Sequence, residues 1–170
     1  GAKDFSDRRD FVFVGNGKHA PNADAMHLLV GDVWPRLRTA CPEASLHIYG
    51  AYLPASVRTA HQPKQGVFIR GWAEDLQSVM ESARVQLAPL RFGAGIKGKI
   101  LEAVCHGLPT LTTATGSEGI YTGASPEALE AEPGAGFVEK AKTLYTDAGV
   151  WQTARNEARL RARDHFQGGR

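Results

Sequence analysis

Short apolar runs recur along the chain and are separated by stretches with helical periodicity. The first run, Phe11–Val14, is continuously apolar and does not alternate with polar residues. This pattern is typical of a strand that is buried on both faces of a parallel sheet. Similar runs predict further strands at residues 46–49, 67–70, 85–89 and 109–113, and a weaker pattern predicts a short last strand at 127–132.

The intervals between these runs have the periodicity of helices. After Pro21, apolar residues recur at helical spacing until Cys41-Pro42, and we expect Asn22 to be the N-cap with Asp24 in the first turn. Further helices are predicted from Glu74 or Asp75 and at residues 98–106, 136–145 and 148–165, with a short helix or a loop at 53–62. This alternation predicts an α/β fold: a doubly wound, mostly parallel, Rossmann-like sheet with helices on both faces.

The length and the composition favour one domain. A chain of 170 residues, with 42% hydrophobic and 22% charged residues, is long enough for one core and short for two. We expect residues 1–10 to be a loose lead-in, 11–166 to form the domain and 167–170 to be a tail. A net charge of +2 gives no case for a nucleic-acid partner. No apolar run could span a bilayer and no secretion signal is recognisable, so the expected location is cytoplasmic.

Several reactive or charged side chains have an ordinary structural interpretation. Cys41 and Cys105 are expected to be reduced packing residues, with Cys105 on the apolar side of its helix. The six histidines show no metal-binding spacing and no Asp-x-Asp pair occurs, so no metal site is expected. Four arginines of the last helix predict a solvated face: Arg155, Arg159, Arg161 and Arg163.

Candidate chemistry concentrates in the turn between the fourth predicted strand and the helix that follows it. Gly93, Gly95 and Gly98 lie in this turn. Glycines let backbone N–H groups approach an anion closely, and the helix adds the positive end of its dipole. Phosphate is therefore the expected ligand. A second glycine turn, residues 15–17, follows the first strand at the edge where open α/β sheets bind ligands.

Two phosphate-binding motifs fit the first of these turns only in part. G-x-G-x-x-G after a strand is the dinucleotide fingerprint of NAD and FAD proteins, which also needs an acidic residue at the end of the next strand. Here that strand ends at Thr113, and the nearest acid is Glu118. Residues 93–99 read G-x-x-x-x-G-K, as in a P-loop, but Ile100 stands where a Ser or Thr would bind Mg²⁺. Neither motif is complete.

The segment FGAGIKGKILEAVCHGLPTLTT resembles the donor-site segment of retaining, GT-B-fold glycosyltransferases of the group 1 type. The usual form in that family is a Gly-Phe-Gly turn, a helix with Leu-Glu-Ala, then Gly-x-Pro and a strand. The resemblance extends to FVGNGKHAPNADA, VWPRLRTACPEASLHIYG and VFIRGWAEDLQSVMESARV, and it covers Phe11 to about Phe166. It implies that the chain is one half of a GT-B architecture, the C-terminal domain that binds a nucleotide sugar.

The resemblance also implies roles for individual residues. Glu102 matches the helix glutamate that binds the ribose hydroxyls, whereas Ala94 stands where the family has a second glutamate that faces the sugar. We expect Lys97, ahead of Lys99, to bind the diphosphate, and Lys97 and Glu102 are the catalytic candidates. The other expected donor contacts are Gly15, Asn16, Gly17, Gly71, Trp72, Arg91, Gly93, Gly95, Ile96, Gly98 and Glu118.

Some of these residues have a second interpretation. Arg91 either binds the phosphates or caps a loop. Trp72 either contacts the base or covers the core. Glu118 either replaces the carboxylate missing at Ala94 or lies on the surface. His19, next to the second glycine turn, is expected to be solvated.

The implied function is transfer of a sugar from a nucleotide diphosphate sugar to a glycan, a lipid or another acceptor, as in polysaccharide biosynthesis. The family transfers with retention and needs no metal or other cofactor, because positive groups and helix dipoles stabilise the departing diphosphate. The acceptor would be bound by a missing N-terminal domain, and the full-length protein could lie at the inner face of a membrane. Two alternatives stay open: an NAD- or FAD-dependent oxidoreductase domain, and a nucleotide-sugar isomerase or binding module of the same fold.

Overall fold

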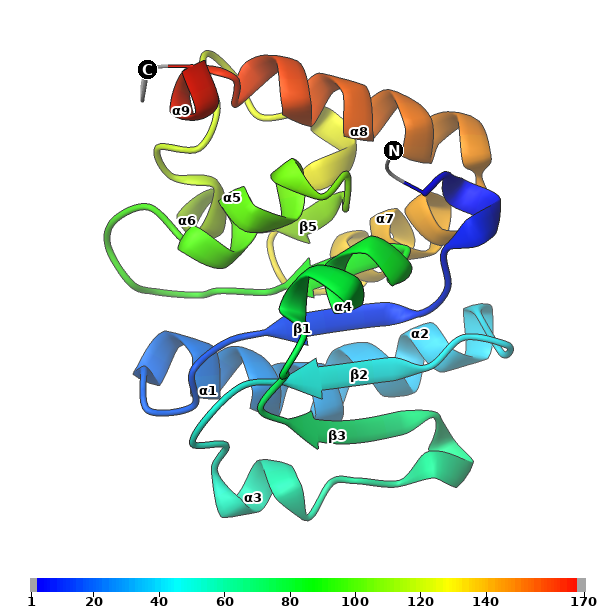
Figure 1. The fold of residues 1–170 in the computed structure, drawn as a ribbon. Helices are drawn as coiled ribbons and strands as arrows, with labels where there is room; N and C mark the ends of the chain where they lie inside the picture. The colour runs from blue at the N-terminus through cyan, green and yellow to red at the C-terminus, as the bar shows by residue number, and fades with distance from the viewer. Residues whose placement is uncertain (1–2, 168–170) are drawn as a thin grey trace.

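Five parallel strands form the centre of the computed structural model, which describes residues 3–167 (Figure 1). They lie in the order β3-β2-β1-β4-β5, so the sheet grows outward from β1 in both directions. The strands are β1 Phe11–Val14, β2 Leu46–Tyr49, β3 Val67–Gly71, β4 Val85–Ala88 and β5 Thr110–Thr112. The five predicted strands and the doubly wound α/β fold are confirmed.

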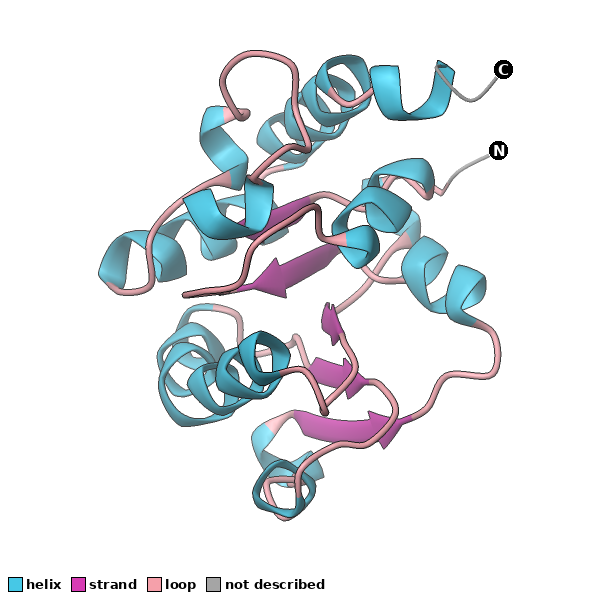
Figure 2. Cartoon of the chain, turned by 90° about the vertical axis from the view of Figure 1, so that its left-hand side faces the viewer, coloured by secondary structure: helices cyan, strands magenta, loops and turns pink. Residues whose placement is uncertain are grey.

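Helices cover both faces of the sheet (Figure 2). Alternate residues of β1 point into two separate cores, because successive side chains of a strand lie on opposite faces. Phe11 and Phe13 belong to the larger core, and Val12 and Val14 to the smaller core, which Met80 of α4 completes. The helices are α1 Ala20–Leu28, α2 Trp34–Ala40, α3 Ala55–Arg58, α4 Leu76–Ser82, α5 Gly98–Cys105, α6 Ala114–Ser117, α7 Ala135–Thr146, α8 Ala148–Arg161 and α9 Asp164–Gln167.

The helix after β1 starts earlier than predicted. α1 begins at Ala20 and continues through a π-helical turn, Leu29–Val33, into α2. The prediction of Asn22 as N-cap is wrong. His19 occupies the N-cap position, and Asn22 Nδ2 donates to the Asn16 carbonyl at 3.1 Å. Proline is tolerated in the first helical turn, where no N–H is needed, so the helix can begin before Pro21.

The C-terminal part differs from the prediction in two places. Residues 127–132 do not form a last strand; they contain a 3-10 turn, Glu127–Leu129, and one isolated parallel bridge between Thr112 and Glu130. The predicted last helix is divided into α8 and α9. The rest of the predicted tail, residues 168–170, lies outside the described residues.

The N-terminal segment is packed on the domain. Arg8 is fully buried and donates to the carbonyls of Met80 and Ala83 at the end of α4 and of His106 after α5. The last carbonyls of a helix lack partners within that helix, so they suit a buried guanidinium. Burial lowers the pKa of Arg8 to about 10. The expectation of a loose lead-in is therefore wrong for residues 3–10.

Two side chains, one predicted on the surface and one in the core, have the opposite burial in the structure. Arg155 is buried, pairs with Asp4 at 3.0 Å and lies over the Trp151 ring, so it is not part of a solvated face. Cys105 is exposed, whereas Cys41 is buried as expected, and both thiols are free. Among the described helices, none has the length and apolar character needed to cross a membrane.

Candidate functional site

The strand order places a crevice beside β1. The sheet grows in one direction through β2 and in the other through β4, and open α/β sheets bind ligands at the carboxyl ends of the strands at such a switch point. β1 pairs with β4 only through Phe11 with Val85 and Val12 with Gln86. The two strands then separate. A cavity of about 400 Å³, here called the crevice cavity, lies between their ends.

Three cavities follow one another along the carboxyl edge of the sheet. The crevice cavity is followed by a middle cavity of about 190 Å³ between β1 and β2 and an outer cavity of about 620 Å³ between β2 and β3. Asn16 and Lys99 line both the crevice and the middle cavity, and Trp72 lines both the middle and the outer cavity. No Asp or Glu of the described chain lines any of the three. This edge therefore suits an anionic ligand.

The turn between β4 and α5 is closed by a lysine side chain. Gly93 and Gly95 have φ angles of 114° and 87°, which favour glycine. Lys97 is the N-cap residue of α5, and its ammonium donates to the carbonyls of Gly93 (3.1 Å), Gly95 (2.6 Å) and Thr115 (3.2 Å). Its side chain is only 16% exposed. All three N–H donors of this ammonium are used inside the protein.

Lys99 and Glu102 form an exposed ion pair on α5. Lys99 Nζ lies 2.9 Å from Glu102 Oε1, and the two side chains are 46% and 45% exposed. Lys99 lines the crevice and middle cavities, whereas Glu102 is not among the described residues that line them. The Lys99 side chain therefore lines the two cavities, and the Glu102 carboxylate lies next to it without lining them.

The turn after β1, residues 15–17, continues the parallel ladder beyond the strand. The N–H groups of Gly15 and Gly17 donate to the carbonyls of Tyr49 (3.0 Å) and Ala51 (2.9 Å) in and after β2. A Cβ on Gly17 would lie 2.1 Å from the Tyr52 carbonyl oxygen. The two loops therefore approach each other more closely than any side chain at Gly17 would allow.

Arg91 has a partner outside the three cavities. Its Nε and Nη2 donate to the two carboxylate oxygens of Asp24 on α1, at 2.9 and 2.6 Å. This bidentate pair holds the pKa of the Asp24 carboxyl below its usual value and raises the pKa of Arg91. Arg91 thus links the segment after β4 to the helix after β1.

Glu118, the expected replacement for the carboxylate missing at Ala94, lies across the glycine turn. Its Oε1 is 3.9 Å from Lys97 Nζ, and its side chain is 57% exposed. Ala94 and Ile96 line the crevice cavity, whereas Glu118 is not among the described lining residues. Glu118 is thus next to the glycine turn, where it contacts Lys97. Its contact with a sugar stays a prediction.

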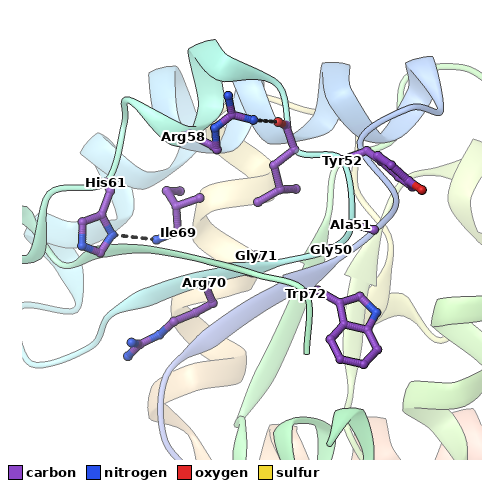
Figure 3. Close-up of a pocket in the computed structure, with 10 residues that line it drawn as sticks. Gly50, Ala51, Tyr52, Arg58, His61, Ile69, Arg70, Gly71 and Trp72 are labelled. Carbon is purple, nitrogen blue, oxygen red and sulfur yellow. Dashed lines mark hydrogen bonds between the residues drawn. The ribbon is translucent and has the colours of Figure 1, made fainter. Parts of the chain in front are cut away.

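Trp72 lines both the middle and the outer cavity, and Figure 3 shows it among the residues that line the outer one. Its side chain is 70% exposed, so the interpretation of Trp72 as a cover for the core is wrong. Gly71, at the end of β3, has a φ of 76°, and its carbonyl accepts the Gly50 N–H at 2.8 Å. An exposed ring on a cavity wall can stack on a planar ligand.

Gln86 is the site residue that the sequence analysis missed. It is buried in β4, with 1% exposed, and lines the crevice cavity. Its Oε1 accepts the Val14 N–H at 3.2 Å, and its Nε2 donates to Thr110 Oγ1 at 3.1 Å and approaches the Lys99 carbonyl at 3.5 Å. The available signal was a single polar residue in an otherwise apolar strand, because a buried amide requires partners.

The histidines and acidic residues of the described chain form no cluster of metal ligands. Within residues 3–167, no group of three or more His, Cys, Asp or Glu side chains could hold a metal ion. His19 is exposed, as expected, and lines the crevice cavity from the start of α1.

Comparisons with known proteins identify the family. The family Glycosyl transferases group 1 matches residues 8–147. No curated protein sequence matches at a significant level. Among solved structures, TarM superposes with 13% identity over 95% of this chain and 34% of TarM, at a TM-score of 0.69. The pneumococcal O-GlcNAc transferase GtfA, in complex with UDP and GlcNAc, has 16% identity over 99% of this chain and 37% of GtfA, at a TM-score of 0.62.

A third structure corresponds to a domain of similar size. The C-terminal domain of LpcC, a group 1 family protein from Francisella tularensis, has 13% identity over 89% of this chain and 83% of that domain, at a TM-score of 0.65. These likenesses concern the fold, which is one half of a GT-B architecture. The chain spans about a third of the first two proteins. Because the family match covers most of the chain, the dinucleotide-dependent oxidoreductase is not favoured, and the chain belongs to the group 1 glycosyltransferases.

Proposed function

We propose that this domain binds the nucleotide diphosphate sugar of a glycosyltransferase, with the diphosphate in the crevice cavity. The observation that carries the proposal is the composition of this cavity. The N-terminus of α5, two lysines and a glycine turn meet there, and no Asp or Glu of the described chain lines it. Backbone N–H groups and the positive end of a helix dipole favour an anion at such a place.

The two lysines would meet the diphosphate in different ways. Lys99 would exchange Glu102 for a phosphate oxygen, and this exchange would release the Glu102 carboxylate for the ribose hydroxyls. Lys97 would give up at least one of its three carbonyl partners. A charged phosphate is a stronger acceptor for an ammonium than a neutral carbonyl, which favours the exchange at Lys97. The Lys99–Glu102 pair is exposed and therefore weak, so a phosphate held at the N-terminus of α5 can replace the carboxylate.

The remaining contacts follow from the order of the three cavities. Trp72 and the backbone of Gly71 would hold the base where the middle and outer cavities meet. The turn at residues 15–17, together with Ala94 and Ile96, would face the phosphates and the transferred sugar, with Glu118 in place of the missing carboxylate. Arg91 would bind phosphate only after leaving Asp24, and we propose the loop-linking role for it.

The transfer step would need a second domain. We propose that an N-terminal domain outside this chain holds the acceptor, and that transfer proceeds with retention and without a metal ion. The charge that develops on the departing diphosphate would be stabilised by Lys97, Lys99 and the N-terminus of α5. We place the whole protein in the cytoplasm or at the inner face of a membrane, in polysaccharide biosynthesis.

Nucleotide binding by this domain tests the proposal. A thermal-shift screen against UDP, GDP and ADP sugars identifies the base, because a ligand that binds only the folded state raises its stability. Calorimetry with the corresponding diphosphate then compares the wild type with Glu102→Gln and with Glu139→Gln, an exposed helical control on α7.

We expect Glu102→Gln to lose about 1.5–3 kcal/mol of binding free energy for each charge-assisted bond to the ribose, with little change in Tm. Glu139→Gln should bind like the wild type. Equal affinities of all three proteins would place Glu102 outside the site. No stabilisation by any nucleotide would contradict the proposed function.

A further inference from the structure

The N–H groups of β1 alternate between its two neighbours. Phe11 and Gly15 donate to carbonyls of the β2 segment, at Ser45 and Tyr49. The even-numbered residues therefore direct their N–H groups toward β4, as the alternation of a parallel ladder requires. Backbone pairing with β4 has already ended at Val12.

The side chain of Gln86 replaces the missing ladder bond. Val14 N–H donates to Gln86 Oε1 at 3.2 Å, and no main-chain carbonyl of β4 takes this place. The amide therefore stands between the two strand ends as a spacer. The crevice cavity opens directly beyond it, with Gln86 in its wall.

The same amide also reaches the other wall of the crevice. Its Nε2 donates to Thr110 Oγ1 at 3.1 Å and lies 3.5 Å from the Lys99 carbonyl in the first turn of α5. Val14 leads directly into the turn at residues 15–17, and Lys99 carries the cation that lines two cavities. One buried side chain thus touches the backbone of both walls.

We propose that Gln86 is a positioning residue of the donor site. It sets the width of the crevice and holds the turn after β1 and the first turn of α5 at the separation that a diphosphate requires. An apolar residue of the same length would leave the Val14 N–H without its acceptor, and the two strand ends could then change their spacing. The ligand in this inference rests on the proposed function; the spacer role does not.

Gln86→Met tests the inference, because methionine keeps the length of the side chain and removes its hydrogen bonds. Thr112→Val is the matched control: it removes a buried hydroxyl that donates to the Ala88 carbonyl at 2.7 Å. Thr112 itself lines none of the three cavities, and its bond joins β5 to β4 without touching β1. We expect similar losses of Tm in both variants. In Gln86→Met, UDP affinity should fall about tenfold, and uridine affinity should change less than about threefold. In Thr112→Val, the ratio of UDP affinity to uridine affinity should stay unchanged. GDP and guanosine, or ADP and adenosine, replace this pair if the screen selects another base.

Amide hydrogen exchange tests the spacer role without a ligand. In Gln86→Met, the Val14 N–H should exchange at least about tenfold faster, while the Gly15 N–H, bonded to the Tyr49 carbonyl, keeps its protection. If Gln86→Met does not fold, Thr110→Val must show the same selective loss of diphosphate affinity, reduced to about threefold.

The outcomes separate the two proposals. Faster exchange at Val14 with an unchanged ratio of diphosphate to nucleoside affinity would overturn the positioning role and leave the proposed function intact. Unchanged exchange at Val14 would overturn the spacer role. If no nucleotide binds the wild type, the proposed function fails, and the exchange experiment still decides whether Gln86 separates the strands.

Discussion

Two glycine turns border the crevice, and they are stabilised in opposite ways. The turn after β1 is held by backbone hydrogen bonds to the loop after β2, and at Gly17 the space for a side chain is occupied by the Tyr52 carbonyl. The turn after β4 is closed by the Lys97 ammonium, and Gly95 has open space where a Cβ would lie. Glycine serves close approach at Gly17 and an unusual φ angle at Gly95.

This difference gives the two walls different capacities to respond to a ligand. The first turn can move only if the loop after β2 moves with it. The second can rearrange when one ammonium changes its partners. We therefore expect nucleotide binding to alter the structure mainly at residues 93–98, and the following variants test this comparison from the largest expected effect to the smallest.

Gly17→Ala should have the largest effect. The added methyl group would lie 2.1 Å from a backbone oxygen, so the loop after β2 must shift, and we expect a loss of about 3 kcal/mol in the free energy of unfolding. Urea unfolding measures this loss. Gly31→Ala is the control, because nothing lies within 4 Å of its Cβ position and alanine is favoured in a helix by about 1 kcal/mol. If Gly17→Ala and Gly31→Ala have equal free energies of unfolding, close approach does not hold the first turn.

Lys97→Met should be next. It removes hydrogen bonds from a charged donor to three carbonyls, and we expect a loss of about 2 kcal/mol in the free energy of unfolding. Lys99→Met removes an exposed ion pair and should change stability by less than about 0.5 kcal/mol. Chemical denaturation of both variants measures the difference, and equal losses would show that Lys97 does not close the turn.

The same two variants should also differ in binding. We expect Lys97→Met to lose more affinity for a nucleoside diphosphate than Lys99→Met, because it removes a phosphate partner and also loosens the turn. Both losses should be small for the nucleoside, and the loss at the more exposed Lys99 should shrink with added salt. Calorimetry at two salt concentrations provides the measurement. If Lys97→Met weakens nucleoside and diphosphate equally, the turn does not hold the phosphates.

Gly95→Ala should have a smaller effect, caused by backbone strain alone. Its φ of 87° is unfavourable for alanine, but no atom lies within 4 Å of the Cβ position. We expect a loss of about 1 kcal/mol in the free energy of unfolding. A loss as large as that of Gly17→Ala would show that the second turn is as tightly enclosed as the first.

Arg91→Gln should have the smallest effect. It removes the exposed ion pair with Asp24 that links the segment after β4 to α1. Because the hydrogen bond from Arg91 lowers the pKa of Asp24 in the folded state, the pair stabilises above the pKa of an unfolded aspartate, and its contribution is lost as the pH falls through the lowered pKa. Arg91 is 52% exposed, so we expect Tm to fall by only about 1–2 °C at pH 7.

Thermal unfolding at several pH values checks the sign of this effect. The difference between the wild type and Arg91→Gln should disappear well below pH 3.8, the ordinary pKa of aspartate. Asp24→Asn should resemble Arg91→Gln at pH 7. A difference that persists in acid would mean that Arg91 stabilises the protein through a contact other than Asp24.

Local sequence patterns predicted most of the framework of this domain. The continuous apolar run at Phe11–Val14 predicted a strand covered on both faces, and the glycines before α5 predicted a turn, in which the structure gives Gly93 and Gly95 positive φ angles. The position of Lys99 at the start of α5 followed from helix boundaries alone. These features depend on the preferences of neighbouring residues, which a single segment contains.

The contacts that shape the site depend on residues far apart in the chain. Gln86 Oε1 accepts the N–H of Val14, 72 residues away in the chain, and Arg8 donates to the carbonyl of His106, 98 residues away. The ammonium of Lys97 turned toward its own loop and Thr115, although the pattern alone allowed it to point to solvent or to a ligand. A polar side chain takes the partners that burial leaves nearby, and only the packing of strands and helices from distant segments determines which partners those are.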